Sequence, residues 1–412
     1  MVSVENEDKI LILIPPFWGH INPLIGITKR LVEESYIIVF YSLSEFKDII
    51  VKTGAEYREY PYFPIVKANE KSHVPTVITL FTSFLDIADQ TIPYFVDIFE
   101  KEKPDLIIYD FISFYSKCLL IHLQHRYLIG VSNIPPPKAL LFFPSFCLNI
   151  EIFPEENFLK TMIEPVPNEE VIKSFEAHVK KVSDKYSLNL STMSPIEYMT
   201  SLKEKLVIVS TFRELQPKGE EFKEPYKFVG SCSVTENREF YITDPKVKQL
   251  LGSFDPINPI KSLTLCVVIS ICQTVYNLYQ EKIANENYSC PDNVLLLTWV
   301  PQLEVLQRAS LFISHCGMNS VNESIHYGVP LICIPQGGDQ PMVAHRIADE
   351  LYLGIKLDTP TLTSEKVRKS IHQVLNDETY RKNMIEISKV SRKYTGIKTA
   401  VEEISKYITE NN

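Results

Sequence analysis

Residues 299–340 read WVPQLEVLQRASLFISHCGMNSVNESIHYGVPLICIPQGGDQ, and this stretch decides the fold class. It contains two short apolar runs, at 311–314 and 331–334, which we predict to be buried strands. Between them the sequence predicts a helix over 320–327. A strand, a helix and a second strand in this order are typical of a parallel sheet covered by helices. The stretch therefore predicts an α/β protein.

Polar side chains gather where the first of these strands meets the helix. Exposed N–H groups and the positive end of the helix dipole form an anion site at such a point. His315, Asn319 and Ser320 can donate hydrogen bonds to a phosphate, and Gly317 lets the backbone approach a ligand closely. Glu323 lies one turn further along the same face and can accept from hydroxyls. The pattern favours a diphosphate flanked by hydroxyl-bearing rings.

The same alternation of strands and helices extends along the rest of the chain. A helix is expected to start at Pro23 after an Asn22 cap. Residues 135–200 show weak periodicity and are interpreted as helices and loops over the carboxyl edge of the sheet. The polar, proline-broken stretch 231–262 is a predicted linker between two α/β domains. Further predicted strands cover 9–15, 36–41, 104–110, 127–132, 206–210, 227–230, 263–271 and 294–298, and further helices cover 345–350 and 364–376.

The composition indicates a globular protein that does not bind nucleic acid. The chain has 412 residues, of which 45% are apolar, and its formal net charge is −9. An acidic chain lacks the dense basic face that nucleic-acid binding requires. The eight cysteines follow no metal-binding spacing, so we interpret them as buried thiols. No signal peptide and no apolar run of membrane-spanning length is recognised, so we expect a cytoplasmic protein without a membrane span.

Nine residues of the first stretch stand in the order and spacing of a known signature: Trp299, Gln302, His315, Gly317, Asn319, Ser320, Glu323, Asp339 and Gln340. The stretch resembles the nucleotide-sugar signature of the UDP-glycosyltransferases, family 1 of the GT-B fold. Its length is similar to that in the soluble bacterial macrolide glycosyltransferases. The resemblance implies two Rossmann-like domains whose parallel sheets face each other across a cleft.

The resemblance also implies a division of the chain. The acceptor-binding domain is expected at 1–230, and the UDP-sugar-binding domain at 263–395. A C-terminal helix over 396–412 is expected to pack back on the first domain. We expect a UDP-sugar donor as co-substrate and neither a cofactor nor a metal.

By the same resemblance, each signature residue has a role in holding the donor. Trp299 stacks on the uracil, Gln302 lies near the base or ribose, and Glu323 takes the ribose hydroxyls. The diphosphate is held by the side chains at the start of the helix, His315, Asn319 and Ser320. Asp339 and Gln340 bind hydroxyls of the sugar, and Gln340 often accompanies glucose donors. Taken without the resemblance, the Asp-Gln pair could instead cap a helix.

The resemblance assigns catalysis to two residues of the N-terminal domain. His20 falls where the family has its general base, and Asp110 falls where it has the carboxylate that orients the histidine. A neutral imidazole removes the proton of an acceptor hydroxyl, whose oxygen attacks the anomeric carbon as UDP leaves from the opposite face. The carboxylate fixes the histidine tautomer and stabilises the imidazolium.

Aromatic residues near His20 are candidates for the acceptor pocket. Phe17 and Trp18 stand beside it in the sequence. Further phenylalanines could extend an apolar wall or form ordinary core: those between 81 and 99, with Phe142, Phe143, Phe146 and Phe153. A mostly apolar pocket suits a small lipophilic molecule with a hydroxyl, such as a phenolic, a flavonoid or a xenobiotic, and this suggests detoxification.

One segment of the family pattern has no counterpart in this chain. Family members open the second domain with a strand, a Ser-x-Gly-Ser/Thr loop that touches the diphosphate, and a helix. Here the linker runs directly into the strand predicted at 263–271, so the second domain is expected to lack its first strand and helix. The loss exposes a sheet edge and removes one diphosphate-binding element. A divergent or inactive variant, or an incorrectly spliced gene, would explain it.

These observations lead to one function and one alternative. We expect a monomer that transfers a hexose, with glucose favoured, from a UDP-sugar to a hydroxyl of a small lipophilic acceptor. The alternative is a catalytically inactive homologue that binds a small molecule without transfer, which the missing segment favours. A dinucleotide-dependent oxidoreductase is disfavoured, because no G-x-G-x-x-G follows any predicted strand.

Overall fold

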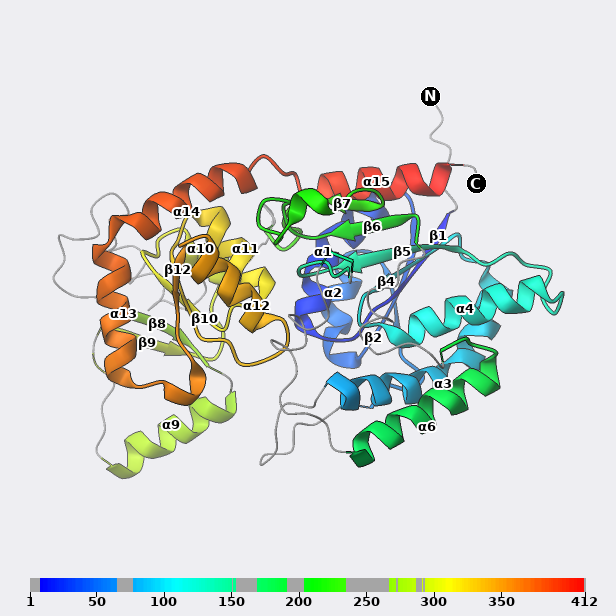
Figure 1. Cartoon of the computed structure of the whole chain (residues 1–412), viewed down its shortest axis with the longest axis horizontal. Coiled ribbons are helices and arrows are strands. Elements are labelled where there is room, and N and C mark those ends of the chain that lie inside the picture. Colours follow the sequence, from blue (N-terminus) through cyan, green and yellow to red (C-terminus); the bar gives the residue numbers. More distant parts are fainter. Residues whose placement is uncertain are drawn as a thin grey trace.

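The chain forms two α/β halves that lie side by side along the longest axis of the molecule (Figure 1). The computed structural model describes residues 8–64, 77–149, 151–152, 169–190, 204–234, 267–271, 273–286, 291 and 293–410. The N-terminal half is built on a seven-stranded sheet, and the C-terminal half on sheets of two and three strands. The predicted class, α/β with parallel sheets in two Rossmann-like halves, is confirmed.

The sheet of the N-terminal half is doubly wound. Its strands are β1 (Lys9–Leu13), β2 (Ile37–Ser42), β3 (Glu56–Glu59), β4 (Leu106–Asp110), β5 (Lys138–Phe143), β6 (Leu206–Val209) and β7 (Tyr226–Phe228). They lie in the order β3-β2-β1-β4-β5-β6-β7, and every pairing is parallel. The order reverses direction between β1 and β4. The carboxyl ends of two such strands are where open α/β sheets bind ligands.

Alternate residues of each strand face opposite sides of this sheet. The face that carries Leu11 and Leu13 is covered by α3 (Val77–Glu102), α4 (Phe114–Leu128) and α6 (Glu169–Tyr186). The face that carries Ile10 and Ile12 is covered by α1 (Trp18–Glu33), α2 (Lys47–Val51) and α15 (Ile397–Thr409). Both faces are therefore buried, which explains why the strands read as continuous apolar runs.

The C-terminal half contains the signature stretch. Its strands are β8 (Val267–Ser270), β9 (Val294–Leu297), β10 (Phe312–Ser314), β11 (Leu331–Cys333) and β12 (Gly354–Lys356), paired in parallel as β8-β9 and as β10-β11-β12. Its helices are α9 (Gln273–Glu286), α10 (Gln302–Leu306), α11 (Met318–Tyr327), α12 (Gln340–His345), α13 (Ser364–Asn376) and α14 (Glu378–Ser391). The order predicted for 311–334 is confirmed by β10, α11 and β11.

Apolar side chains join the two halves. Phe212 and Leu215, which follow β6, belong to the same buried cluster as Val321 and Ile325 of α11. The cluster places the first turns of α11 against the carboxyl end of the seven-stranded sheet. Buried apolar surface therefore anchors the signature stretch on the N-terminal half.

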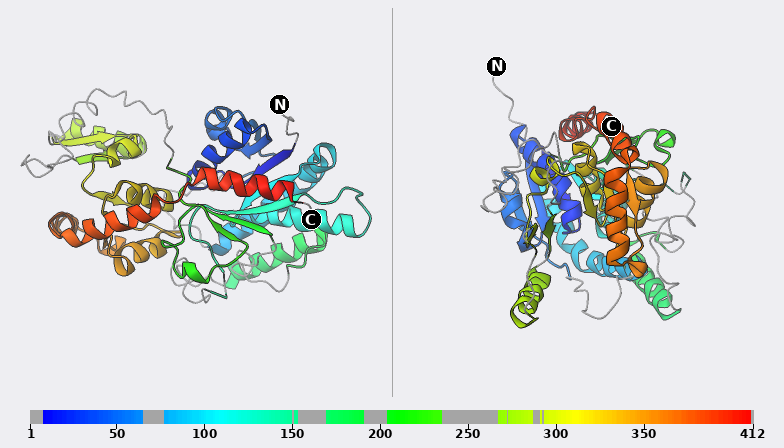
Figure 2. Two further views of the ribbon diagram at one scale, coloured as in Figure 1. Left: turned by 90° about the horizontal axis from the view of Figure 1, so that it is seen from above. Right: turned by 90° about the vertical axis from the view of Figure 1, so that its left-hand side faces the viewer.

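The last helix, α15, returns to the N-terminal half, and Figures 1 and 2 show it in red over that half. The chain returns to the N-terminal half next to residues 229–231, where it leaves that half. Gly396 has φ 54°, and its N–H donates to Val229 O at 2.9 Å. A Cβ at Gly396 would lie 2.2 Å from Ser231 O, so this close approach requires glycine.

The end of α15 is held by a lysine from the seven-stranded sheet. Lys138 Nζ donates to the carbonyl oxygens of Tyr407, Ile408 and Glu410 at 2.8, 3.0 and 2.6 Å. A cation is well placed there, because the last carbonyls of a helix lack partners within the helix and carry the negative end of its dipole. Lys138 thus fixes α15 on the N-terminal half.

Two predictions about the region after β4 are wrong. Residues 127–132 are not a strand, because α4 continues to Leu128 and a turn follows it. The strand of this region is β5, which lies inside the sheet within the stretch 135–200, for which helices and loops are predicted. The short apolar run at the end of α4 fits a helix as well as a strand, so periodicity could not separate the two.

Three helices also differ from their predictions. α1 begins at Trp18, so Pro23 lies inside the helix and not in its first turn. The helix predicted at 345–350 is a π-helical segment (Arg346–Glu350) that continues α12. The long helix α3 is missing from the prediction and contains Pro93, a residue that normally marks a helix end.

The structure describes residues 231–234 of the predicted linker, and residues 235–266 lie outside it. The prediction that the second half lacks its first strand and helix concerns the same segment and stays a prediction. In the described part of the chain, no helix combines the length and the apolar character needed to cross a membrane.

Candidate active site

Two residues that are 90 positions apart meet where the strand order reverses. His20 lies in the first turn of α1, shortly after β1, and Asp110 is the last residue of β4. His20 Nδ1 lies 2.5 Å from Asp110 Oδ2. The contact forms because β1 and β4 are parallel neighbours, so their carboxyl ends share one edge of the sheet. The structure therefore brings the predicted base and its predicted orienting carboxylate together.

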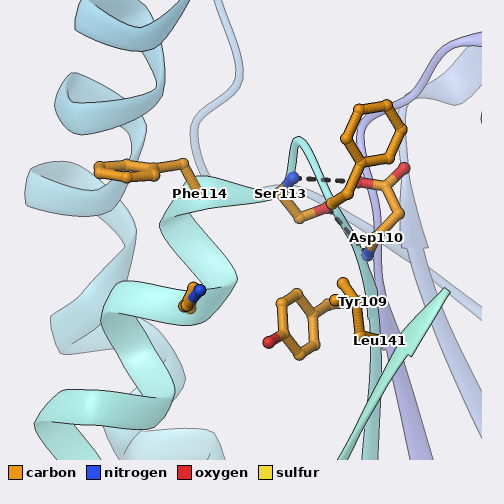
Figure 3. Close-up of a pocket in the computed structure, with 7 residues that line it drawn as sticks. Tyr109, Asp110, Ser113, Phe114 and Leu141 are labelled. Carbon is orange, nitrogen blue, oxygen red and sulfur yellow. Dashed lines mark hydrogen bonds between the residues drawn. The ribbon is translucent and has the colours of Figure 1, made fainter. Parts of the chain in front are cut away.

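The Asp110 carboxylate is buried in a turn that its own chain forms. Its Oδ1 accepts from the N–H groups of Ile112 and Ser113 at 3.2 and 2.9 Å, and from Ser113 Oγ at 2.7 Å. These donors replace water around a buried anion. Figure 3 shows Ser113 and Asp110 at the edge of a small pocket lined by Tyr109, Asp110, Phe111, Ser113, Phe114, Lys117 and Leu141.

This arrangement decides which nitrogen of His20 is basic. An ionised carboxylate only accepts hydrogen bonds, so Nδ1 carries the proton that is donated to Asp110. Nε2 is then the nitrogen with the available lone pair. A neutral imidazole in this tautomer can take a proton from a hydroxyl group.

Aromatic rings pack around His20. Phe111 lies nearly parallel to the imidazole, with ring centroids 6.1 Å apart, and stacks in turn on Phe143 at 5.1 Å. Phe17 approaches His20 edge-on at 5.9 Å. Trp18 instead stacks on Phe46 at 6.3 Å. Of the two residues predicted for the acceptor pocket, the structure therefore brings Phe17 to the histidine.

The wider apolar wall predicted for the acceptor is part of the core. These phenylalanines are at most 3% exposed: Phe81, Phe84, Phe95, Phe99, Phe142, Phe143 and Phe146. Phe153 lies outside the described residues. These side chains stabilise the core, because they are buried in the apolar clusters of the sheet and the helices that pack on it. Phe143 reaches the site through its stack with Phe111.

Three signature residues of the C-terminal half form one polar cluster. Gln302 Nε2 donates to Glu323 Oε2 at 2.6 Å and to Ser320 Oγ at 3.3 Å. Ser320 and Glu323 are three residues apart on α11 and therefore share a face. Trp299 stands before α10 and is 56% exposed, so part of its indole is open to a planar ligand.

His315 and Gly317 lie between β10 and α11. Burial lowers the pKa of His315 below its usual value, and the nearby Asp339 carboxylate partly opposes this. A Cβ on Gly317 would lie 2.6 Å from His315 Nε2, so the glycine leaves room for the imidazole ring. Between the two, Cys316 has φ 65°, an uncommon conformation for a residue with a side chain. This backbone turn sets where the ring lies.

Asp339 and Gln340 stand at the start of α12, but their side chains do not cap it. Asp339 accepts a hydrogen bond from Ser145 Oγ of the N-terminal half. Gln340 Oε1 accepts from the N–H groups of Gln336 and Gly337 at 2.8 and 3.2 Å. Asp339 therefore faces the N-terminal half, and Gln340 holds the loop that follows β11.

Helix α11 makes polar contacts with the N-terminal half at two points. Asn319 Nδ2 donates to Gly19 O at 3.2 Å. One turn further along, the buried Asn322 donates from Nδ2 to Ser210 O at 3.1 Å and accepts from Thr211 Oγ1 at 3.1 Å. The same helix thus carries signature residues and hydrogen bonds to the half of the molecule that contains His20.

Sequence reasoning missed Phe111, Ser113 and Ser145. Asp110 and Ser113 form a D-x-x-S pattern, which is typical of a turn and could have indicated that Ser113 holds the carboxylate. The stacking of Phe111 on His20 and the contact of Ser145 with Asp339 depend on tertiary structure, and no local pattern signals them. Among the described residues, no group of three or more His, Cys, Asp and Glu side chains is arranged to hold a metal ion.

Comparison with known proteins points to one family. Residues 268–396 match the family model described as UDP-glucoronosyl and UDP-glucosyl transferase. The uncharacterized UDP-glucosyltransferase YojK of Bacillus subtilis is 27% identical, and the alignment covers 96% of both chains. The NDP-glycosyltransferase YjiC of Bacillus licheniformis is 26% identical, with 98% of both chains covered. The solved structure of the calicheamicin glycosyltransferase CalG4 has a TM-score of 0.71 at 19% identity, with 98% of both chains covered.

Two parallel-sheet halves that match this solved structure define a GT-B glycosyltransferase fold. The polar cluster of the C-terminal half lies within residues 268–396, which match the family model. The matched family model and these relatives, which align along almost the whole chain, support a glycosyltransferase of the UDP-glycosyltransferase type.

Proposed function

We propose that the protein transfers glucose from UDP-glucose to a hydroxyl of a small lipophilic acceptor, with inversion at the anomeric carbon. The observation that carries this proposal is the His20–Asp110 pair, with its 2.5 Å contact at the carboxyl edge of the sheet. The pair lies next to α11, because Gly19 accepts from Asn319. Glucose is supported by the match to a UDP-glucosyltransferase along almost the whole chain.

His20 acts as the general base. Its Nε2 takes the proton of the acceptor hydroxyl as the oxygen forms a bond to the anomeric carbon. The bond from that carbon to the UDP oxygen breaks on the opposite face, which inverts the configuration. Asp110 stabilises the imidazolium that forms, as the carboxylate of a serine-hydrolase triad does. The face of the Phe111 ring adds a favourable interaction with the same cation.

The signature residues hold the donor. The start of α11 faces the diphosphate and, with the neutral His315 and with Ser320, stabilises the charge that develops on the leaving group. The remaining donor contacts are those that the family signature implies: Trp299 to the uracil, Gln302 and Glu323 to the ribose, and Asp339 and Gln340 to the sugar. When the donor binds, a hydroxyl of the sugar replaces the Ser145 hydroxyl as the hydrogen-bond donor to Asp339.

The acceptor lies on the side of His20 where Phe17 is found. Phe17 is 40% exposed, and its ring and the imidazole meet in a T-shaped arrangement. An exposed aromatic ring beside the base favours a lipophilic acceptor whose hydroxyl can reach Nε2. The residues proposed for the base and for the donor come from one chain, which supports action as a monomer.

Replacement of the base tests this function. We expect His20→Ala to lower the rate of UDP release from UDP-glucose, with a pool of phenolic acceptors, by at least about a hundredfold, because general-base catalysis contributes about that much. UDP-glucose binding, measured by calorimetry, should stay within about twofold of the wild-type Kd, because His20 is not a donor ligand. His372→Ala, which removes an exposed histidine of α13, is the matched control and should keep full activity.

Two outcomes would contradict the proposal. Equal UDP release by His20→Ala and the wild-type protein would exclude this histidine as the base. Intact UDP-glucose binding without release by the wild-type protein, across the acceptor pool, would favour an inactive homologue that binds its donor without transfer.

A further inference from the structure

A proline inside α1 leaves one carbonyl of that helix without its usual partner. In an α-helix, the N–H of each residue donates to the carbonyl four residues before it. Pro23 has no N–H and lies inside α1, so it cannot donate to Gly19 O. Gly19 directly precedes His20, so the free acceptor lies next to the proposed base.

The C-terminal half supplies the missing donor. Asn319 is the second residue of α11, and its Nδ2 donates to Gly19 O at 3.2 Å. A side-chain amide carries two N–H groups, so one can bond Gly19 while the other remains for a second acceptor. The adjacent Ser320 belongs to the polar cluster of the signature. The contact therefore joins the helix of the base to the helix that carries the signature.

A carbonyl freed by a proline accepts a hydrogen bond from another helix at a second place in this protein. Pro93 lies inside α3 and cannot donate to Asp89 O. The hydroxyl of Tyr186, on α6, donates to that oxygen at 2.8 Å. A carbonyl that is freed by a proline thus accepts from a neighbouring helix in both places. The α3–α6 contact lies between two covering helices and provides a matched control.

We propose that Asn319 is a positioning residue, which sets the place of His20 relative to the donor through the carbonyl that Pro23 frees. The proposal rests on the function proposed above for His20. Transfer requires the base, the acceptor oxygen and the anomeric carbon to stand in a fixed arrangement, and small misplacements lower the rate steeply. The Asn319–Gly19 hydrogen bond fixes the base relative to the anomeric carbon of the donor, because α1 carries the base and α11 faces the donor.

Pro23→Ala tests the link and leaves the donor-binding side chains in place. The substitution adds an N–H at this position, which bonds Gly19 O within the helix and competes with Asn319. Alanine also favours a helix interior, so the variant should fold. We expect kcat to fall about five- to tenfold, the effect of losing one hydrogen bond. The Kd for UDP-glucose should stay within about twofold.

Two comparisons separate positioning from a general structural effect. Pro93→Ala makes the same change in α3, and we expect it to alter the melting temperature while kcat stays within about twofold of wild type. In a His20→Ala background, Pro23→Ala should have no further effect on the residual rate, because there is no base left to position. A fall of the same size in that background would overturn the proposal.

A second measurement does not depend on turnover. Binding of UDP should slow hydrogen exchange of the amides in the first turns of α1 in the wild-type protein, and Pro23→Ala should reduce this protection. Unchanged kcat in Pro23→Ala, or UDP protection of α1 that the variant does not reduce, would contradict the link. Full activity of His20→Ala would instead contradict the proposed function, so the two failures are distinguishable.

Discussion

At the residue scale, individual side chains in this site fix the position or the tautomer of their neighbours. Asp110 uses one carboxylate oxygen for its own turn and the other for His20, which fixes both the ring and its tautomer. Gly317 acts by having no side chain, since its φ of −63° suits any residue and only the space beside His315 requires glycine. The His315 ring is therefore placed by the backbone and kept neutral by burial.

The neutral state of His315 predicts a pH dependence of donor binding. Burial lowers the pKa of His315 in the free protein, and a bound diphosphate favours the imidazolium and raises it. Binding therefore takes up a proton between the free and the bound pKa, and the affinity for UDP-glucose should rise as the pH falls from about 8 toward 5.5. The expected gain is up to about tenfold for each unit between the two pKa values. Calorimetry over this pH range measures it.

Two variants check that the effect belongs to His315. His315→Gln should bind UDP-glucose more weakly and with a flat pH profile. Burial also lowers the pKa of His122, which lies on α4 in the N-terminal half, so His122→Gln should keep the wild-type profile. A flat profile in the wild-type protein would show that His315 does not meet the diphosphate.

At the scale of the elements, helices α1 and α15 lie far apart in the sequence but pack together in one core. α1 carries His20, the proposed base, and packs against α15, whose end is held by Lys138 of β5. The sequence predicts β1, β2, β4 and β6 well, because each is a continuous apolar run between polar residues. It misplaces the start of α1, because proline is most common in the first turn of a helix and Pro23 lies further inside this one.

Loss of the Lys138 contacts should loosen α15. Lys138→Met keeps the length of the side chain but leaves the carbonyls of Tyr407, Ile408 and Glu410 without their charged donor. We expect the free energy of unfolding to fall by about 1.5–3 kcal/mol, the range for hydrogen bonds to charged groups. Urea denaturation measures the change, and hydrogen exchange should localise it to α15.

Lys406→Met is the control on the same helix. The Lys406 side chain is exposed and pairs with Glu410 at 3.7 Å, so its loss should change the free energy of unfolding by less than about 0.5 kcal/mol. Equal effects of the two substitutions would show that Lys138 contributes no more than a surface charge.

In the whole molecule, α11 connects the two halves. Its buried Asn322 is hydrogen-bonded to Ser210 and Thr211, which directly follow β6. Val321 and Ile325 belong to the apolar cluster that joins the two halves. The two halves of the candidate site are therefore linked by hydrogen bonds at Asn322 and at Asn319.

Asn322→Ala should weaken the connection between the halves. The substitution leaves Ser210 O and Thr211 Oγ1 buried without their partner, which costs about 1–3 kcal/mol of the free energy of unfolding. Thr211→Val should cost less, and the two changes should be non-additive because they break one contact. Asn376→Ala, at the exposed end of α13, should stay within about 0.5 kcal/mol. Additive effects of the first two substitutions would show that Asn322 and Thr211 are not coupled.

The sequence indicated much of the candidate site, because the predicted catalytic and donor-binding residues follow strands, and parallel strands end at one edge. His20 and Asp110 could be paired in this way, and Trp299, His315 and Glu323 stood in a signature. The contacts between the halves could not be predicted. Asn319 to Gly19, Ser145 to Asp339 and Asn322 to Thr211 depend on how two separate folding units lie against each other, and no local pattern encodes that.

The return of α15 has a consequence for synthesis on the ribosome. Ala400, Val401 and Ile404 of α15 complete the core under β1 and α1, which are made long before it. The part of the sheet face that α15 covers stays open until α15 has left the exit tunnel, while α1 and α2 can cover the rest. Domains usually fold in order from the N-terminus during translation. The core of this N-terminal half is instead completed only after the whole C-terminal half has been made.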